Sequence, residues 1–455
     1  MMHPGSDQHR GMMTGHAVRW TPFASIALGL WLITSPVTFG YRSPAMAWSD
    51  IISGLLVVIF AAVSVFPGRG WTQWANAVVG IWLLFAPLVF CAPDPAAYIN
   101  DTLIGALVIA FSILIPGMPG MRMLPGPEVP PGWSYNPSSW FQRAPVIALG
   151  IVSFVIARYL AAFQLGYIDQ VWDPFFGEGT RRALTSSVSH AWPVSDAGLG
   201  ALAYLLEVLS GFMGDRLRWR TMPWMVLMFG VLVIPLGLTS IILVILQPVA
   251  VGTWCTLCLI TALTMLIMIP LAVDEVVAMG QFLAQVHRER QPFWTNFWRG
   301  GTMVGGAAEE AITYQTPARE IIASVVRGVT LPWNLVVSAL IGLWLMAAPA
   351  VLGARDLSAG NDYLVGPLIT VVAVIAMAEV LRPGRYVNII LGLWLIAAPW
   401  FLAGANAATI WNDGIAGLAL ILLSLPLGPV RQRYGGWTQV ARWTPGPIRR
   451  RSLAE

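Results

Sequence analysis

The chain has 455 residues, of which 57% are hydrophobic and only 11% are charged, and its mean hydropathy is +0.69. A soluble domain of this length could not bury so much apolar surface, so a soluble protein is excluded and a polytopic membrane protein is indicated. All 26 basic residues are arginine and the net charge is +4, which indicates contact with the head groups of a lipid bilayer. No basic stripe with interleaved aromatic residues occurs, so we expect no nucleic-acid partner.

Residues 1–20 form a polar N-terminal tail. The tail contains His3, His9 and His16 but no apolar core before a small-residue cleavage site, so we expect no cleaved signal peptide. Three histidines can bind a metal ion, but a disordered tail is the simpler interpretation of such a polar segment.

A repeated pattern occupies residues 21–120 and returns in residues 331–428. Its first half is Gly-x-Trp-Leu with a proline five residues after the tryptophan, and its second half has Asp followed by Gly four residues later. Each copy predicts a helical hairpin of about 50 residues, so each flank is a module of four spanning helices. The tryptophans are Trp31, Trp82, Trp344 and Trp394, and the Asp/Gly pairs are Asp50 and Gly54, Asp101 and Gly105, Asp362 and Gly366, and Asp413 and Gly417.

The acidic residue and the glycine each suit a place in such a hairpin. We expect each Asp to cap the start of a helix, with ion binding as the alternative, and each Gly to let a neighbouring helix approach closely. The pattern resembles the family of SPW repeats, because Ser35-Pro36 keeps the first two positions of the Ser-Pro-Trp motif and Ala398-Pro399-Trp400 keeps the last two. This resemblance implies membrane residence and supplies no chemistry.

Four further apolar segments lie between the flanks, near residues 144–165, 196–213, 222–246 and 253–272. They predict a central four-helix bundle at 143–275, preceded by a Pro/Gly-rich connector at 121–142 and followed by a linker at 276–330 and an Arg-rich tail at 429–455. The fold class we predict is therefore an all-α polytopic membrane protein with about 12 transmembrane helices, in which two four-helix repeat modules flank the bundle.

Arginine is concentrated at alternate ends of these helices. By the positive-inside rule, both termini, the linker and the tail are predicted to be cytoplasmic, in a multi-pass protein of the cell membrane. Residues 166–195 and the start of the fourth central helix then lie on the exoplasmic side, where disulfide chemistry is favoured. The arginine-rich ends hold Arg69, Arg143, Arg216, Arg218, Arg220, Arg382 and Arg385, whereas the opposite ends hold Arg42, Arg181, Arg182 and Arg355.

Two of the three cysteines, Cys255 and Cys258, form a C-x-x-C motif inside this apolar region. Pro248 and Gly252 interrupt the hydrophobic run before the motif, and Thr253 is placed to cap a new helix. Thiols at the start of a helix are acidified by the unpaired N–H groups there, which makes Cys255 a competent thiol exchanger. The alternative is a pair of inert thiols packed as small apolar side chains.

The central region resembles the vitamin K epoxide reductase family, a four-helix bundle that holds a quinone against a C-x-x-C motif at the outer membrane face. The likeness is carried by Thr253-Trp254-Cys255-Thr256-Leu257-Cys258-Leu259, by Ser186-Ser187 ahead of Trp192-Pro193-Val194, and by Gly200 with Tyr204 one turn later. It implies that Cys255 exchanges disulfides with a thiol partner and that Cys258 faces the quinone. The implied catalytic residues are Cys255 and Cys258, the implied quinone-binding residues are Ser187, Asp196, Gly200, Tyr204 and Trp254, and no metal is implied.

The chain departs from this family at three places. Asp196 stands where some members have an Asn that contacts the quinone, and helix capping is an equal interpretation of it. Ala262 stands where some members have Tyr. The segment 166–195 lacks the cysteine pair that usually shuttles electrons, and Cys91 cannot replace a pair.

Other polar residues leave alternatives open. Arg158 and Glu207 are costly in hydrocarbon, so we expect a structural ion pair between them, with a proton path to the quinone as the alternative. His190 is either an inert loop side chain or a proton relay. A zinc site is not expected, because two Cys and one His leave the usual four-ligand shell incomplete.

The sequence therefore favours a membrane thiol-disulfide oxidoreductase that exchanges electrons between the dithiol and a lipid-soluble quinone of the menaquinone or ubiquinone type. Its second partner is expected to be an exoplasmic thiol or a thioredoxin-like protein. The alternative is a non-catalytic membrane scaffold whose central domain is a degenerate remnant, an interpretation that the missing loop cysteines support.

Overall fold

The computed structural model describes residues 20–66, 69–113, 124–309 and 317–444. Within these ranges the secondary structure is helical, and the β contacts are isolated bridges. Eleven of the described helices are long and apolar enough to cross a membrane. A further helix of 17 residues, α8 (Asp196–Phe212), is just shorter than these. The predicted fold class, an all-α polytopic membrane protein with about 12 spanning helices, is confirmed.

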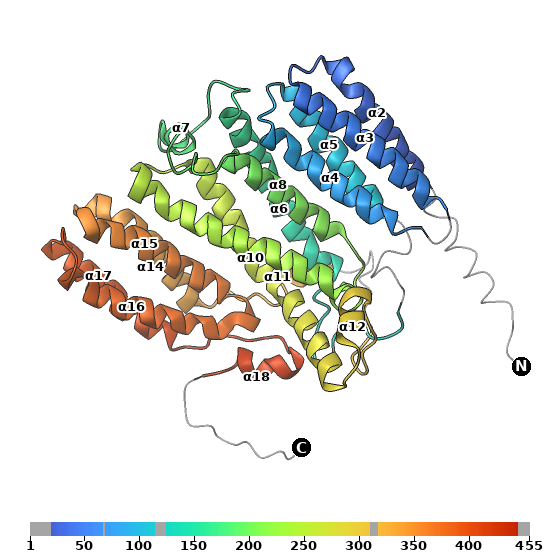
Figure 1. Cartoon of the computed structure of the whole chain (residues 1–455). Helices are drawn as coiled ribbons and strands as arrows, with labels where there is room; N and C mark the ends of the chain where they lie inside the picture. The colour runs from blue at the N-terminus through green and yellow to red at the C-terminus, as the bar shows by residue number, and fades with distance from the viewer. Residues whose placement is uncertain (1–19, 67–68, 114–123, 310–316, 445–455) are drawn as a thin grey trace, which may run out of the picture.

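Three blocks of antiparallel helices lie side by side (Figure 1). The N-terminal module comprises α2 (Thr21–Phe39), α3 (Pro44–Ser64), α4 (Thr72–Val89) and α5 (Pro95–Ile113). The central bundle comprises α6 (Trp140–Gln164), α8, α10 (Pro223–Leu246) with the π-helical turn η1 (Gln247–Val251), and α11 (Thr256–Arg288). The C-terminal module comprises α14 (Trp333–Leu352), α15 (Asp356–Ile375), η2 (Glu379–Tyr386), α16 (Val387–Ala397), η3 (Ala398–Trp400) and α17 (Ala407–Ser424).

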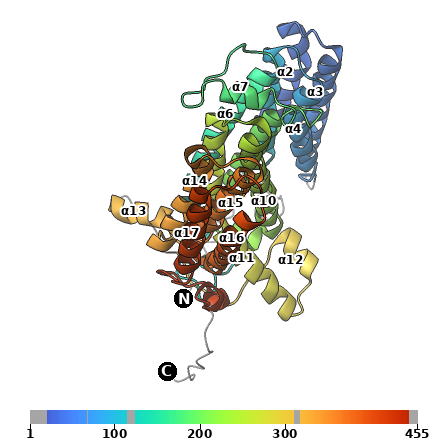
Figure 2. The same ribbon diagram turned by 90° about the vertical axis from the view of Figure 1, so that its left-hand side faces the viewer.

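Short helices lie in the connections between these blocks. They are α7 (Gly179–Leu184), α9 (Arg218–Thr221), α12 (Phe293–Arg299), α13 (Ala318–Val325), η4 (Gly435–Trp437) and α18 (Thr438–Ala441). The turn between α10 and α11 lies at the same end of the molecule as α7, and we call this the Cys255 end; α18 lies at the opposite end (Figure 1). Helices α12 and α13 project to opposite sides away from the Cys255 end (Figure 2).

The repeat glycines bring the two helices of each hairpin into close contact, as predicted. A Cβ on Gly29 would lie 2.7 Å from the carbonyl oxygen of Gly54, and a Cβ on Gly54 would lie 2.6 Å from that of Gly29. The same reciprocal contact joins Gly80 to Gly105, Gly342 to Gly366 and Gly392 to Gly417. Because real Cβ atoms do not approach a carbonyl oxygen so closely, a larger residue would force the helices apart.

The repeat tryptophans join the two hairpins of each module. In the N-terminal module the indole of Trp31 donates to Asn100 Oδ1 at 2.9 Å, and the indole of Trp82 donates to Ser49 Oγ at 3.1 Å. In the C-terminal module Trp344 donates to Asn412 and Trp394 donates to Asn361, both at 2.8 Å. Every acceptor directly precedes a repeat Asp, so the pattern explains why Trp and Asp recur together.

The prediction that the repeat Asp residues cap helices is wrong. Each lies six residues beyond the first residue of its helix, because α3, α5, α15 and α17 begin earlier than expected, at Pro44, Pro95, Asp356 and Ala407. The Asp side chains are buried inside the modules, at 0% or 1% exposure. The capping side chains are instead those of residues such as Asn406, which accepts from the N–H of Thr409 at 3.0 Å.

Several arginines at the end opposite Cys255 are structural, which corrects the expectation that they contact lipid head groups. Arg218 is 1% exposed and donates two hydrogen bonds of 2.6 Å to the Glu275 carboxylate. Arg220 is fully buried and donates to backbone carbonyls, including those of Pro127 at 3.0 Å and Gly301 at 3.1 Å. Arg143, Arg382 and Arg385 are buried as well. Desolvated guanidinium groups of this kind stabilise the connections between blocks rather than bind lipid.

Helix α11 is longer than predicted, since it passes Pro270 and continues to Arg288 instead of ending near residue 272. A proline removes one backbone hydrogen bond but does not end a helix that is held by packing. Beyond the proline, Ala278, Phe282 and Val286 are buried in a cluster with Trp219 and Tyr434. This cluster links the central bundle to the last described segment of the chain.

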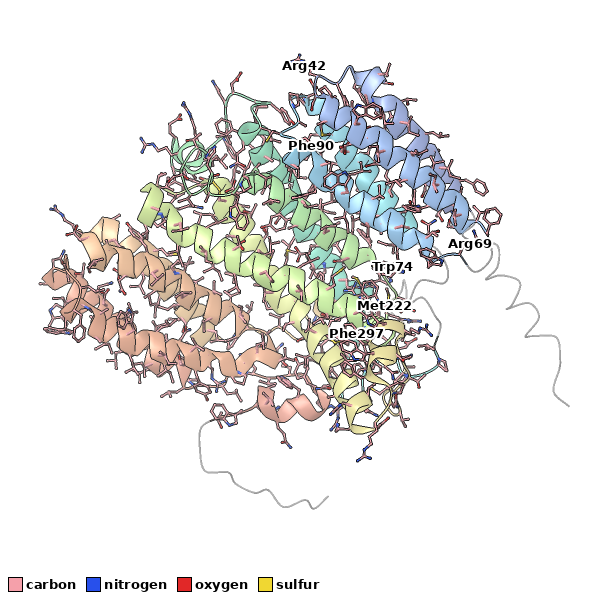
Figure 3. All side chains as sticks on the ribbon, viewed as in Figure 1. Arg42, Arg69, Trp74, Phe90, Met222 and Phe297 are labelled. Carbon is pink, nitrogen blue, oxygen red and sulfur yellow. A yellow bond between two sulfur atoms is a disulfide. The ribbon has the colours of Figure 1, made fainter. Side chains whose placement is uncertain are left out.

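The two modules contact the bundle through different helices. The N-terminal module packs α4 and α5 against α8, and the C-terminal module packs α15 against α10 and α11. At the end opposite Cys255, the rings of Trp74 on α4 and Trp224 on α10 lie 5.0 Å apart. Met222 and Phe297 belong to the same cluster (Figure 3). The bundle is thus covered by a module on each side, and its Cys255 end is the place where η1, α7 and α11 meet.

Candidate functional site

Cys255 and Cys258 are joined by a disulfide at the start of α11. Cys255 is the N-cap of the helix, and its Sγ accepts a hydrogen bond from the Cys258 N–H at 3.1 Å. The expected cap, Thr253, lies two residues earlier, because Gly252 ends η1 in a left-handed conformation with φ of +74° and Cys255 follows in an extended one. The Cys255 N–H donates to Gln247 Oε1 at 2.9 Å, which fixes the turn before the motif.

A cavity of about 370 Å³ lies beside the disulfide, between α6, α8, α10 and α11. Cys258 lines this cavity, whereas Cys255 is 0% exposed and packs among Leu160, Leu184 and Leu257. Of the two cysteines, Cys258 therefore lines the cavity and Cys255 does not. The wall is mainly aliphatic, and its polar side chains are Asp196, Tyr204, Thr239, Ser240, Gln247, Cys258 and Thr261.

Three of the five predicted quinone-binding residues line the cavity, namely Asp196, Gly200 and Tyr204. A Cβ on Gly200 would meet only the Ala157 Cβ, at 3.9 Å, so this glycine leaves open space for a ligand rather than for a neighbouring helix. The Tyr204 hydroxyl lies near those of Ser240 and Thr261. The wall thus combines residues of α8, α10 and α11.

The other two predicted residues lie elsewhere, which corrects those predictions. Ser187 is exposed and is not part of the wall; its neighbour Val188 is. Trp254 packs its ring against that of Tyr363 on α15, with 6.0 Å between centroids, so it faces the C-terminal module.

Asp196 is the first residue of α8, but the N-cap is Ser195, whose Oγ accepts from the Gly198 N–H at 2.9 Å. The Asp196 carboxylate accepts hydrogen bonds from Gln164 at 2.5 Å, Ser189 at 2.9 Å and the Ala197 N–H at 2.8 Å. The acceptor atom of all three hydrogen bonds is Asp196 Oδ1. Asp196 therefore both holds the loop before α8 and lines the cavity, so the two interpretations of this residue are compatible.

Residues 166–195, the outer loop, cover the buried face of the disulfide. Within this loop Asp173 accepts hydrogen bonds from the N–H groups of Phe176 at 2.9 Å and Thr180 at 2.8 Å, and from the Thr256 hydroxyl at 2.5 Å. Thr256 directly follows Cys255, so one carboxylate joins the loop to the redox motif. A Cβ on Gly179 would lie 2.1 Å from the Trp254 carbonyl oxygen, so the loop also touches the motif backbone.

The electrostatics of Asp173 reflect these contacts. Partial burial acts to raise the pKa of its carboxyl, but the hydrogen bonds from Thr256, Phe176 and Thr180 outweigh burial, and the pKa lies well below its ordinary value. The carboxylate is accordingly ionised while the loop is closed. Its hydrogen bonds are of the stronger, charge-assisted kind.

The predicted ion pair between Arg158 and Glu207 is wrong. Arg158 turns toward the N-terminal module, where it donates to the Thr102 hydroxyl at 2.7 Å and stacks over the Tyr98 ring at 4.3 Å. Glu207 is 1% exposed, and neither of its oxygens accepts a hydrogen bond among the described residues. Glu207 lies one turn from Tyr204, so an unpaired carboxyl group adjoins the cavity wall.

Sequence reasoning missed Gln247, Asp173 and Thr256. Of these three residues, Gln247 could have been found from the sequence, because a single glutamine at the end of an apolar run, eight residues before a cysteine, is unusual in a membrane helix. Nothing in the sequence singles out Asp173 among the polar residues of the outer loop. His190 is exposed, with Nδ1 3.0 Å from the Ser186 carbonyl oxygen. Among the described residues no group of three or more His, Cys, Asp or Glu side chains is placed to hold a metal ion.

A cysteine pair at the end of a four-helix membrane bundle, with one cysteine in the wall of an apolar cavity, is an arrangement suited to membrane redox chemistry. Residues 144–273 match the vitamin K epoxide reductase family, and residues 19–115 and 332–426 match the SPW repeat domain. The chain therefore carries a domain of the vitamin K epoxide reductase family between two SPW repeat domains, as the sequence motifs predicted. No curated protein and no solved structure matches the chain.

Proposed function

We propose that this protein is a membrane thiol-disulfide oxidoreductase that exchanges electrons between the Cys255/Cys258 pair and a lipid-soluble quinone of the menaquinone or ubiquinone type. One observation carries the proposal: Cys258 lines an apolar cavity inside the bundle, while its disulfide partner Cys255 does not line it and is fully buried next to residues of the outer loop. The match of the bundle to the vitamin K epoxide reductase family supports a membrane redox function.

The cavity fits a quinone ring in size and chemistry. Its volume of about 370 Å³ falls in the range of about 300–1,000 Å³ that is typical of small-molecule sites. A quinone ring is flat and apolar with two carbonyl oxygens, and it therefore requires an aliphatic wall with a few hydrogen-bond donors. The Tyr204 hydroxyl and the Gln247 amide are such donors in this wall.

Each cysteine has a separate task in this proposal. When the dithiol is oxidised, a bond forms between the two sulfurs, and a bound quinone accepts the two electrons and two protons that they release. Cys258 is the sulfur that contacts the cavity, and Cys255 is the sulfur that exchanges with the thiol partner. Gln247 is a positioning residue, because it holds the Cys255 backbone through one hydrogen bond and also lines the cavity.

The thiol partner must reach Cys255 through the outer loop. The loop contains no cysteine, so electrons pass directly between Cys255 and an external thiol, either a small molecule or a thioredoxin-like protein. Because Cys255 is 0% exposed, this exchange requires two contacts to open first, that of Asp173 with Thr256 and that of Gly179 with Trp254. The closed loop also keeps water away from the sulfur.

The site is proposed to face the exoplasmic side of the cell membrane, with both termini cytoplasmic. The arginine-rich ends of the helices lie opposite the Cys255 end, and the positive-inside rule places such ends in the cytoplasm. An oxidising compartment at the Cys255 end favours thiol oxidation coupled to quinone reduction.

A dithiol-driven quinone reduction assay on the protein in lipid nanodiscs tests the proposal. Wild-type protein is expected to reduce a ubiquinone or menaquinone homologue, and Cys258→Ser is expected to lose the activity. Cys91→Ser is the matched control, since Cys91 is free and exposed, and it should leave the rate unchanged. An unchanged rate in Cys258→Ser would overturn the proposal.

A non-catalytic membrane scaffold is the second candidate, and the burial of Cys255 beneath a loop without cysteines favours it. A thiol titration separates the two candidates. A disulfide between Cys255 and Cys258 that opens and closes reversibly supports the enzyme, whereas a bond that does not re-form after reduction supports the scaffold.

A further inference from the structure

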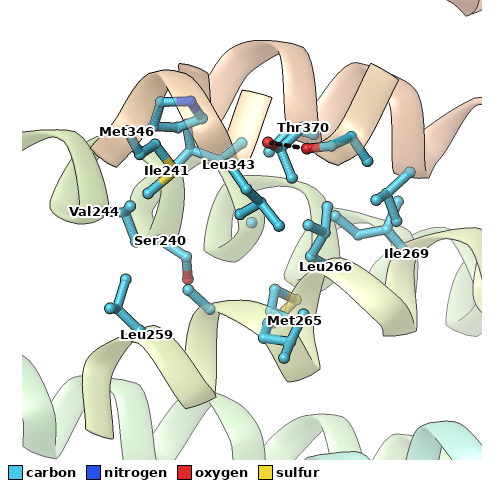
Figure 4. A pocket seen from close by; sticks show the side chains of 17 residues that line it. Ser240, Ile241, Val244, Leu259, Met265, Leu266, Ile269, Leu343, Met346 and Thr370 are labelled. Carbon is cyan, nitrogen blue, oxygen red and sulfur yellow. Dashed lines mark hydrogen bonds between the residues drawn. The ribbon is translucent and has the colours of Figure 1, made fainter. Parts of the chain in front are cut away.

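A second cavity, of about 220 Å³, lies between the central bundle and the C-terminal module (Figure 4). Helices α10 and α11 form one wall and α14 and α15 form the other. Side chains such as Val244, Leu266, Leu343 and Met346 point into it from both blocks (Figure 4). Its few hydroxyl groups include that of Thr370, which already donates to the Gly366 carbonyl at 3.0 Å. The cavity therefore offers almost no hydrogen bonds to a ligand.

This second cavity adjoins the one beside the disulfide. Ser240, Val244 and Ala262 line both cavities, so the two meet between α10 and α11 about one turn beyond Cys258. A third apolar cavity, of about 240 Å³, continues away from the Cys255 end and shares Gly237 and Ile269 with the second. The second and third cavities together form an apolar seam. This seam begins at the cavity beside Cys258 and follows the interface with the C-terminal module.

We propose that this seam binds the polyisoprenoid tail of the quinone, and that the C-terminal module is therefore a part of the substrate site. The inference rests on the proposed function and adds a binding site for the tail of the quinone to the site already proposed for its ring. The carbonyl oxygens of the ring require hydrogen-bond donors, which Tyr204 and Gln247 supply in the first cavity. The tail is long and wholly hydrocarbon, and it needs a passage without unsatisfied polar groups inside the membrane.

Two further observations support a role for this module. Ala262 has a small side chain, and it lies where the first two cavities meet. Trp254, which precedes Cys255, packs against Tyr363 of α15. The C-terminal module thus contacts the redox motif and also forms one side of the seam, whereas the N-terminal module lines none of these three cavities.

The first test is photo-crosslinking in lipid nanodiscs, with a quinone that carries a diazirine near the far end of a four-isoprene tail. The expected result is labelling of α14 and α15, at residues such as Leu343 and Met346, that an excess of unlabelled long-tailed quinone suppresses. Labelling confined to lipid-facing surfaces or to α6 and α8 would overturn the tail assignment. Labelling of α14 and α15 that is not suppressed would mean that membrane lipid fills the seam, and would also overturn it.

The second test compares the binding of quinones with and without the tail. Met346→Trp, which narrows the second cavity and does not line the first, is expected to weaken binding of the long-tailed quinone at least tenfold and to leave a methyl-substituted quinone of the same ring unaffected. Leu340→Trp, at an exposed position of the same helix α14, is the matched control, and Leu266→Trp narrows the seam from α11 if Met346→Trp fails to fold. Equal loss for both quinones, or no loss, overturns the tail assignment, whereas failure of wild-type protein to bind either quinone overturns the proposed function itself.

Discussion

The hydrogen bond between Thr256 and Asp173 is predicted to control access to the disulfide, and Thr256→Val removes it with little change in shape. Thr256 is 4% exposed and its hydroxyl lies 2.5 Å from Asp173 Oδ1. A hydrogen bond to a charged group contributes about 1.5–3 kcal/mol. Asp173 is only partly buried, so the lower end of that range applies. Since about 1.4 kcal/mol is a factor of ten, the population of the open loop should rise about tenfold.

The assay is the rate at which a membrane-impermeant reductant opens the disulfide, followed by alkylation of the released thiols and mass spectrometry. When loop opening is fast relative to reduction, this rate follows the open population, so Thr256→Val should be reduced about ten times faster than wild type. Thr185→Val is the matched control, because its hydroxyl donates only to the Arg181 carbonyl within the same loop, and it should react at the wild-type rate. Equal rates for Thr256→Val and wild type would refute the idea that this bond closes the loop.

Three further predictions follow from other contacts. The pKa of Asp173 is lowered in the closed loop, so its contribution to closure is complete above an ordinary Asp pKa of about 4 and is lost as the pH falls through the lowered value. The disulfide reduction rates of wild type and Asp173→Asn should therefore differ by a constant factor from pH 5 to 8 and become equal in acid. Equal rates near pH 7 would contradict this. Glu275→Gln breaks the buried ion pair with Arg218 and should lower the free energy of unfolding by about 3–5 kcal/mol. Glu207→Gln removes a buried carboxyl group without a hydrogen-bond partner and should leave the unfolding temperature equal or higher. If Glu207→Gln lowered the unfolding temperature more than Glu275→Gln, the ion pair of Glu275 and the unpaired state of Glu207 would both be contradicted. Gly417→Ala places a Cβ 2.5 Å from the Gly392 carbonyl oxygen and should lower the free energy of unfolding by about 1–3 kcal/mol. Gly414→Ala on the same helix is the control, because its Cβ meets nothing within 4 Å and should leave the unfolding temperature unchanged.

The elements that were predictable from the sequence are those with a local signature. Long apolar runs separated by prolines and arginines predicted the number of spanning helices, because a helix in hydrocarbon must satisfy its own backbone. The repeat glycines predicted close helix contacts, and the C-x-x-C motif predicted cysteines at a helix start. Each of these depends on residues near one another in the chain.

The elements that failed depend on partners far apart in the chain. The sequence places the four repeat Asp residues at helix starts because a carboxylate can cap a helix N-terminus, yet the helices begin at residues such as Pro44 and Ala407, six residues earlier. Arg158 was paired with Glu207 because both lie in the bundle, but a module 56 residues away supplies Thr102 as its acceptor. Hydropathy gives the depth of a residue in the membrane and does not give the helix face on which it lies.

The surroundings of the two sulfurs carry the strongest functional argument, since they separate two reactions that must not interfere. A quinone pocket has to be dry and apolar, whereas a thiol partner approaches from water. In the proposed function the bundle meets both needs, because Cys258 lines the cavity and Cys255 is buried at the helix N-cap beneath the outer loop. Because Gln247 holds the Cys255 backbone and also lines the cavity, a ligand that binds its amide is positioned to influence the turn that carries Cys255. We therefore predict that loop opening and cavity occupancy are coupled through Gln247. Gln247→Leu should weaken the effect of added quinone on the reduction rate of the disulfide, while the disulfide remains reducible and the quinone still binds.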